Sequence, residues 1–177
     1  AFTAFRHRFM NTQILMHDNE RALDLEREAY HGGRTEAFWN GETTGKLYKL
    51  DINSMYPAIM RTTPMSVRLK AYFPSYKPTW WEIAHGGYGM VARCKIETDQ
   101  PAYGVVRDSR LIFPVGRFET VLSTPEILYA EAYGHIKEVG EWAYYDQEVI
   151  FSGFVDYFYE VRQRYKAEGN AAYEYLC

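Results

Sequence analysis

The strongest constraint on the fold of this chain is a central block of short apolar segments separated by turn residues. Between residues 66 and 122 the segments are rich in β-branched and aromatic residues, and proline and glycine punctuate them, which is typical of short strands. Strands are expected at 67–73, 80–85, 89–97, 110–114 and 118–122. Because helical spacing flanks this block, the sequence predicts an α+β fold.

Three helices are expected around the block. Asp18 can cap a helix over 19–30, because its side chain can accept a hydrogen bond from the first turn. Ser123 and Glu126 have the spacing of a capping box for a helix that runs to about residue 133. From Gly153 onward, apolar and aromatic residues recur every three or four positions, which predicts a long amphipathic helix.

Two further strand pairs are expected outside the block. Residues 34–39 and 46–53 alternate like strands on either side of a glycine-bounded turn, and they predict a hairpin over 34–53. A short helix over 54–60 follows directly, with a proline tolerated in its first turn. Residues 135–150 predict a strand, a turn and a second strand.

The composition excludes several classes of protein. The chain has 177 residues, of which 47% are hydrophobic and 17% aromatic, so it is not intrinsically disordered. No apolar run approaches the roughly 18 residues that span a bilayer. Cys94 and Cys177 form no disulfide framework, and the five histidines lack the paired spacing of a zinc site.

The charge is unevenly distributed along the chain. The formal net charge is −3 at pH 7, but basic residues are in excess over residues 1–70 and acidic residues over 71–150. A small nucleic-acid-binding domain would carry a uniformly basic surface. Any contact with nucleic acid is therefore expected to be local.

The segment KLDINSMYPAIM, residues 49–60, is the one most suggestive of chemistry. Asp51 closes an alternating strand, and the chain then turns at once into a helical segment. Such a junction presents one carboxylate, which can hold Mg²⁺, beside backbone amides that can meet phosphate oxygens. An aspartate at a strand end is also a common cap or turn residue, so the spacing alone leaves both interpretations open.

Two motifs in this order resemble those of a known family. DINSMYP, with Asp51, Ser54, Met55, Tyr56 and Pro57, resembles motif A of family B DNA polymerases, D-x-x-S-[LM]-Y-P. About 20 residues upstream, residues 30–33 (YHGG) resemble the Y-x-G-G motif of the protein-primed branch, which comprises organellar, viral and linear-plasmid enzymes. Residues 154–169 are similar to the helix that leads into motif B of that branch.

The resemblance implies template-directed transfer of dNMP to a primer hydroxyl with two Mg²⁺ ions. Asp51 and the carbonyl of Ile52 would hold the metal. Tyr56 would exclude the ribose 2′-hydroxyl by filling its space. Backbone amides and one basic residue would bind the phosphates of the incoming nucleotide, and these are Asn53, Ser54, Met55, Tyr56 and Arg162.

The resemblance also implies where nucleic acid and protein partners bind. Residues 30–34 would face the template-primer DNA, since two glycines let the backbone approach a phosphate and an arginine adds a charged contact. The residues are Tyr30, Gly32, Gly33 and Arg34. The acidic insertion over 66–150 would contact the terminal protein, the protein primer of this branch.

Four parts are expected along the chain if the resemblance holds. They are a helical lead-in after a missing exonuclease domain, part of the polymerase palm, the inserted subdomain, and a helix leading into the fingers. Their bounds are 1–30, 31–65, 66–150 and 151–177. The motif B core, motif C and the exonuclease motifs are absent from this sequence, so the chain is expected to be an inactive fragment of a longer polymerase.

Two other functions stay open at this point. The chain could be a stand-alone module that binds DNA or terminal protein, derived from a degenerate polymerase. It could also be an unrelated metal-dependent nuclease, for which Glu36 is the nearby candidate for a second carboxylate. For the polymerase, an intracellular location without membrane attachment is expected, in the host cytoplasm for a phage or plasmid and in the mitochondrion for an organellar plasmid.

Overall fold

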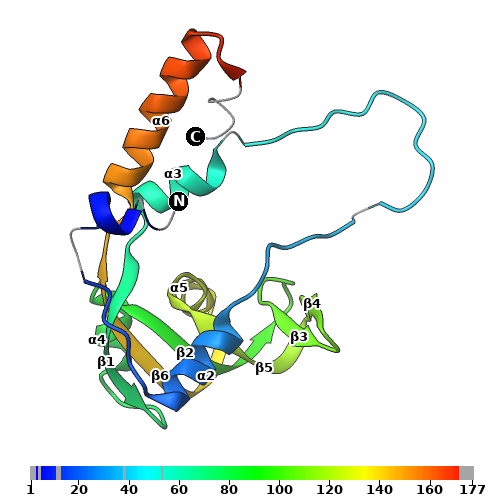
Figure 1. The fold of residues 1–177 in the computed structure, drawn as a ribbon. Helices are drawn as coiled ribbons and strands as arrows, with labels where there is room; N and C mark the ends of the chain where they lie inside the picture. Colours follow the sequence, from blue (N-terminus) through cyan, green and yellow to red (C-terminus); the bar gives the residue numbers. More distant parts are fainter. Residues whose placement is uncertain (1–2, 4, 11–12, 38, 53, 172–177) are drawn as a thin grey trace. The chain divides into compact units, whose positions relative to one another are not determined.

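The computed structural model describes residues 3, 5–10, 13–37, 39–52 and 54–171. It is a mixed α+β structure, as the sequence predicted (Figure 1). The elements are the π-helix η1 (Phe5–Phe9), α2 (Glu20–Ala29), α3 (Met55–Thr62), β1 (Met65–Phe73), α4 (Trp80–His85), β2 (Gly89–Thr98), β3 (Val105–Arg107), β4 (Arg110–Ile112), β5 (Gly116–Ser123), α5 (Thr124–Ala132), β6 (Ile136–Glu148) and α6 (Ser152–Ala167).

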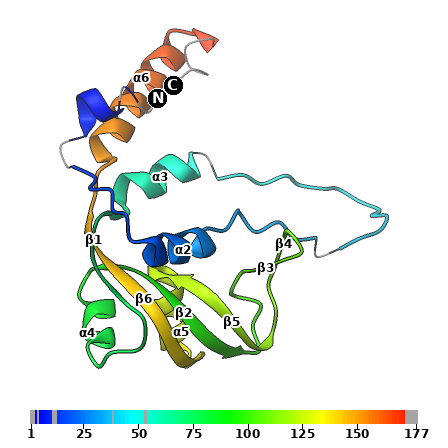
Figure 2. The same cartoon turned by 60° about the horizontal axis from the view of Figure 1, so that its bottom comes forward.

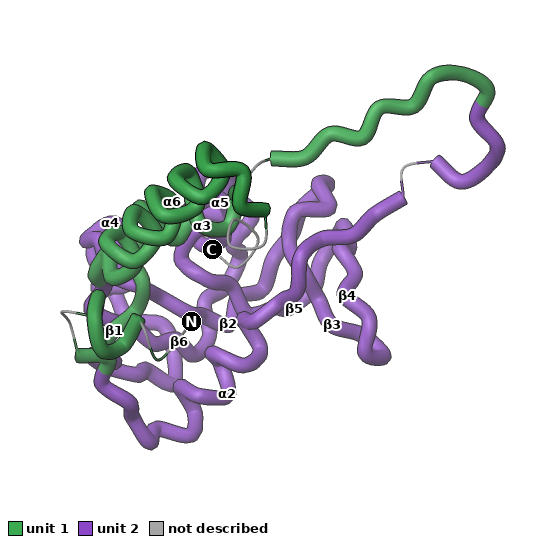
Figure 3. The backbone as a smooth tube through the Cα atoms, turned by 45° about the horizontal axis from the view of Figure 1, so that its top comes forward, with its two compact units in different colours: residues 1–14, 44–67, 148–177 green, residues 15–43, 68–147 purple. Residues whose placement is uncertain are grey.

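The chain divides into two compact units (Figure 3). Unit 1 comprises residues 1–14, 44–67 and 148–177, and unit 2 comprises residues 15–43 and 68–147. Unit 2 therefore contains the Y-x-G-G segment together with most of the expected insertion.

A four-stranded sheet in the order β1-β6-β2-β5 organises unit 2 (Figure 2). Strand β2 pairs in antiparallel fashion with both β5 and β6, and β3 and β4 form a separate two-stranded ribbon. Every second residue of β2 is buried, as expected where side chains alternate between the two faces of a sheet.

One face of this sheet carries the main hydrophobic core. Trp142 of β6 is fully buried there, with its ring stacked on Phe73 at 4.5 Å and set edge-on to Trp80 of α4 at 5.2 Å. Its indole N–H donates to the carbonyl of Ser75 at 3.2 Å. Helix α5 closes the same core with Ile127 and Ala130.

The opposite face is covered by α2. Ala22 and Leu25 of this helix are fully buried, and Ala22 packs with Ala143 and Tyr145 of β6. The helix begins one residue later than expected, because Asn19 and not Asp18 accepts the hydrogen bond from the Ala22 amide at 3.1 Å.

In unit 1, α3 and α6 lie against each other and η1 packs on α6. Phe5 is buried, with its ring 4.6 Å from Phe151 and 5.7 Å from Phe154. The amphipathic helix expected from Gly153 onward is confirmed as α6. Within the described residues, no helix has the length and apolar character needed to span a membrane.

The capping box expected at Ser123 and Glu126 is confirmed. The Glu126 carboxylate accepts hydrogen bonds from the Ser123 amide at 2.8 Å and from the Ser123 hydroxyl at 2.7 Å. The helix that follows is α5, with a proline in its first turn.

The hairpin predicted over 34–53 is wrong for the residues that the structure describes. Residues 34–37 and 39–52 form no strand, and Leu47, Tyr48 and Leu50 are 78–91% exposed. A strand gains its stability from a paired neighbour and a buried face. Alternation in the sequence supplies neither.

Two predictions within unit 2 were also wrong. Residues 80–85 form α4 rather than a strand, because Trp80 and Ala84, four positions apart, are the buried residues, and this spacing belongs to a helix. Residues 136–148 form one long strand rather than two. In place of the expected turn, the strand continues with an irregular register. The two-residue interval from Ala92 to Cys94 in β2 lies opposite the three-residue interval from Trp142 to Val139 in β6.

Truncating Trp142 tests the importance of the core. We expect Trp142→Ala to lower the free energy of unfolding by about 3–5 kcal/mol, because a large cavity remains. Trp39→Ala is the matched control, since Trp39 is 69% exposed and its loss should change stability by less than about 0.5 kcal/mol. Urea unfolding of the 177-residue chain measures both; equal losses would contradict this assignment of the core.

The carboxylate of Glu141 gives unit 2 a pH-dependent contribution to stability. A hydrogen bond from Tyr72 at 2.5 Å, reinforced by the Arg93 guanidinium, holds the pKa of Glu141 below its ordinary value. The stabilisation is therefore complete above the pKa of the unfolded chain and is lost as the pH falls through the lower folded pKa.

We expect Glu141→Gln to cost about 1–2 kcal/mol at pH 7, and the difference from the natural chain to shrink steadily as the pH falls below about 4.3, the ordinary pKa of a glutamate. Thermal unfolding between pH 3 and pH 7 measures this dependence. Glu138→Gln is the control, since Glu138 is exposed and pairs with Lys95. A gap that stays constant from pH 7 down to pH 3 would show that Glu141 acts through packing and not through charge.

Candidate functional site

The motif A segment leads into the N-terminus of α3. Asp51 and Ile52 are exposed and precede the helix in backbone that forms neither helix nor strand. Ser54 takes the left-handed conformation, with φ 54° and ψ 35°, which is uncommon for a residue other than glycine. The Met55 amide then donates to the Ile52 carbonyl at 3.3 Å. Asn53 lies outside the described residues.

The N-terminus of α3 is open to an anion. No acidic side chain stands in the first turn, and Ser54 makes no side-chain capping hydrogen bond. Helix N-termini carry a partial positive charge. Met55 is 38% and Tyr56 72% exposed, so both side chains at the start of the helix are accessible.

Arg162 of α6 reaches the same place. Its Nη1 donates to the Ser54 hydroxyl at 3.4 Å, although the two residues are 108 positions apart. Arg61 of α3 donates to Asp156 of α6 at 2.6 Å and joins the two helices about two turns away. The structure thus brings together two of the expected nucleotide-binding residues.

The Y-x-G-G segment lies at the end of α2 in unit 2. Tyr30 is the C-cap of the helix and is 84% exposed. Gly32 and Gly33 are exposed, and no atom lies within 4 Å of the position that a Cβ would take on either. Neither glycine has a positive φ. The segment is an accessible backbone surface rather than a strained turn.

Arg34 makes several contacts within unit 2. Its Nε donates to Glu36 at 2.8 Å, and its Nη1 donates to the Pro101 carbonyl at 2.8 Å. The guanidinium carbon stands 4.5 Å from the centre of the Phe113 ring. Glu36, the second carboxylate that a nuclease would require, is thus the ion-pair partner of Arg34.

The described residues do not assemble a metal centre by themselves. They contain no group of three or more His, Cys, Asp or Glu side chains that could hold an ion. Asp51 is a single exposed carboxylate. Asp51 can supply one carboxylate ligand to Mg²⁺, but the described residues do not complete the ligand set of a two-metal centre.

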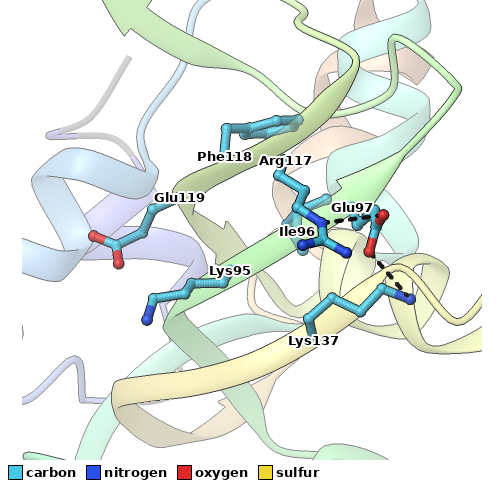
Figure 4. Close-up of a pocket in the computed structure, with 7 residues that line it drawn as sticks. All are labelled: Lys95, Ile96, Glu97, Arg117, Phe118, Glu119 and Lys137. Atoms are coloured by element: carbon cyan, nitrogen blue, oxygen red, sulfur yellow. Dashed lines mark ion pairs between the residues drawn. The ribbon is translucent and has the colours of Figure 1, made fainter.

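A pocket on the sheet of unit 2 is lined by paired charged residues and by Ile96 and Phe118 (Figure 4). Glu97 pairs with Arg117 at 3.1 Å and with Lys137 at 4.0 Å. Lys95 pairs with Glu138 at 2.7 Å. The lining residue Glu119 pairs with Arg93 at 3.8 Å. Each charged residue that lines this pocket therefore already has an oppositely charged partner, although Arg117 and Lys137 share the carboxylate of Glu97.

Sequence reasoning missed the residues that hold these segments in place. Arg61 and Asp156 join α3 to α6, and Arg93 joins α2 to the sheet through Glu28. Each pair is formed by charged residues that are far apart in the chain. Their only signal in the sequence is their charge, which is common to many surface residues.

Comparison with known proteins identifies the family. The sequence model of "DNA polymerase type B, organellar and viral" matches residues 1–177. The chain belongs to this family. The family that the sequence resembled is thereby confirmed.

Individual relatives are distant and much longer. A "Probable DNA polymerase" of Neurospora intermedia is 22% identical, and the match covers 92% of this chain but 18% of that protein. The fold is similar to part of Phi29 DNA polymerase. The TM-score is 0.59 for the complex with single-stranded DNA and 0.54 for a complex with primer-template DNA, at 16% and 17% identity. Each match covers 92% of this chain and 30% or 29% of the Phi29 chain.

Proposed function

We propose that this chain is part of a DNA polymerase that transfers dNMP from a dNTP to a primer hydroxyl under the direction of a template. The observation that carries the proposal is the convergence of Ser54 and Arg162 at the N-terminus of α3. Membership of the type B family supplies the reaction class.

The start of α3 is suited to the triphosphate of the incoming nucleotide. A triphosphate is a polyanion, and the helix N-terminus and the Arg162 guanidinium are both positive. The backbone amides of residues 53–56 and the Ser54 hydroxyl complete this proposed nucleotide site. The open first turn, with no carboxylate of its own, supports this role.

Asp51 is proposed to supply one carboxylate to the catalytic Mg²⁺, with the Ile52 carbonyl beside it. When bound, Mg²⁺ ions in such a centre stabilise the attacking and leaving oxygens of the phosphoryl transfer. The remaining carboxylates would come from polymerase segments other than the described ones. We therefore expect the 177-residue chain to lack synthetic activity by itself.

Tyr56 is proposed to select the sugar. Its ring is exposed on the first turn of α3, two residues from Ser54. A ring stacked against a deoxyribose fills the space that a 2′-hydroxyl would need, so a ribonucleotide would clash.

The proposed DNA and protein contacts lie in unit 2. Residues 30–34 would contact the template-primer, with Tyr30, Gly32 and Gly33 offering the accessible surface and Arg34 its remaining N–H groups. The acidic, β-rich residues of the insertion would contact a terminal protein. The compartment would be that of the replicated DNA, in the host cytoplasm or the mitochondrion.

Asp51→Asn tests the catalytic assignment in the longer polymerase that contains this chain. We expect primer extension with Mg²⁺ to fall by at least about 100-fold, because a neutral amide cannot replace the charged ligand. Binding of primer-template should be unchanged. Glu42→Gln is the control, since Glu42 is an exposed carboxylate in the same extended segment. Extension by Asp51→Asn at the natural rate would rule out this role.

Tyr56→Val tests sugar selection in the same polymerase. We expect the preference for dNTP over rNTP to fall by about tenfold or more, with use of dNTP largely retained, because the obstructing ring is gone. Tyr48→Val removes another exposed tyrosine from the motif A region and should leave the preference unchanged. Single-nucleotide incorporation with each triphosphate measures the ratio. An unchanged ratio in Tyr56→Val would refute the assignment.

A further inference from the structure

The last turn of α2 is fastened to the sheet of unit 2 by one arginine. Arg93 of β2 donates from Nη1 and Nη2 to the two carboxylate oxygens of Glu28, both at 2.9 Å. Such a bidentate pair fixes geometry as well as charge. The Arg93 side chain is only 26% exposed. Glu28 stands two residues before Tyr30, so this contact is close to the start of the Y-x-G-G segment.

Arg93 is itself held in place by residues of the neighbouring strands. Its Nε donates to Glu141 of β6 at 3.0 Å, and Glu141 accepts a second hydrogen bond from Tyr72 of β1. The irregular pairing of β2 and β6 occurs at this point, with Gly140 approaching the Arg93 carbonyl. Bulges of this kind redirect side chains. Glu119 of β5 also lies 3.8 Å from Arg93 Nη1, so all four strands of the sheet contribute to the orientation of this guanidinium.

The far end of the segment is fastened by different residues. The His31 ring packs against Gly104, where a Cβ would lie 3.0 Å from His31 Cδ2. Arg34 bonds to the Pro101 carbonyl and covers the Phe113 ring. Between His31 and Arg34, Gly32 and Gly33 have open space around them.

We infer that Arg93 is a positioning residue for the Tyr30–Gly33 segment. Through Arg93, the sheet of unit 2 fixes the position from which this segment contacts DNA. The DNA part of this inference rests on the proposed function. Arg93 touches no DNA in this role; it fixes the end of the helix from which the segment emerges.

The middle of α2 has an anchor of its own, at Leu25 and Glu26, which separates positioning from general stability. Glu26 accepts hydrogen bonds from Tyr145 at 2.7 Å and from His17 at 2.8 Å, and Leu25 is fully buried. Loss of Arg93 should therefore free residues 27–30, beyond Glu26, while the rest of α2 stays in place.

The experiment compares Arg93→Met with Lys95→Met in the 177-residue chain. Both changes remove one positive charge from the same strand, but Lys95 pairs with Glu138 and not with α2. Amide hydrogen exchange is measured at residues 27–30 and, as an internal reference, at residues 23–25. Affinity for a single-stranded oligonucleotide is measured by fluorescence anisotropy at low salt.

We expect exchange at residues 27–30 to rise at least tenfold in Arg93→Met, with residues 23–25 unchanged, and oligonucleotide affinity to fall several-fold. Lys95→Met should leave exchange unchanged at residues 23–25 and at residues 27–30. It should lower oligonucleotide affinity much less than Arg93→Met does. Arg93→Lys should restore part of the protection, because it keeps one charged hydrogen bond to Glu28.

Unchanged exchange at residues 27–30 in Arg93→Met would overturn the inference, as would an equal rise over both halves of α2, which indicates general destabilisation. If exchange at residues 27–30 rises in Arg93→Met but its affinity for the oligonucleotide equals that of the natural chain, the DNA part of the inference is overturned. If the natural chain binds no oligonucleotide, the proposed DNA contact fails, while the exchange pattern still decides whether Arg93 positions the segment.

Discussion

Strand β2 is covered on both faces of its sheet, and the arrangement of unit 2 depends on the alternation of its side chains. Met90, Ala92, Cys94 and Ile96 enter the core beneath α4 and α5. Val91 and Arg93, on the other face, contribute to the packing of α2. One strand thus presents an apolar surface to one layer and a charged anchor to the other. Burial also raises the pKa of the Cys94 thiol to about 12, so this cysteine is an inert part of the core.

Local patterns in the sequence were sufficient where a few neighbouring residues decide the structure. The capping box of α5 and the amphipathic helix α6 are such cases, because Ser123 and Glu126 bond to each other directly. The long strand β6 was missed because Gly140 has the signature of a turn. It occupies an irregular position against β2, which is visible only when the partner strand is known. Residues 34–53 show the reverse case, in which alternation is present but no pairing partner lies within the described residues.

The candidate site could be predicted only in part, because only some of its residues are neighbours in the sequence. Motif A and the Y-x-G-G motif are contiguous, and their residues could be read from the sequence directly. The position of Arg162 beside Ser54 depends on the packing of α6 on α3, and only the family resemblance gave a reason to expect it. Arg61, Asp156 and Arg93 were not predicted, because an ion pair between distant residues has no local pattern.

The extended segment before α3 has a practical consequence for the isolated chain. Leu47, Tyr48, Leu50 and Ile52 are 69–91% exposed in backbone that forms no strand. Exposed apolar backbone of this kind can pair with a second copy of itself, which is the first step of aggregation. Lys46 and Lys49 interrupt the apolar run and oppose such pairing by charge repulsion. Concentrated preparations at high salt, where this repulsion is screened, are the conditions under which the chain will self-associate most readily.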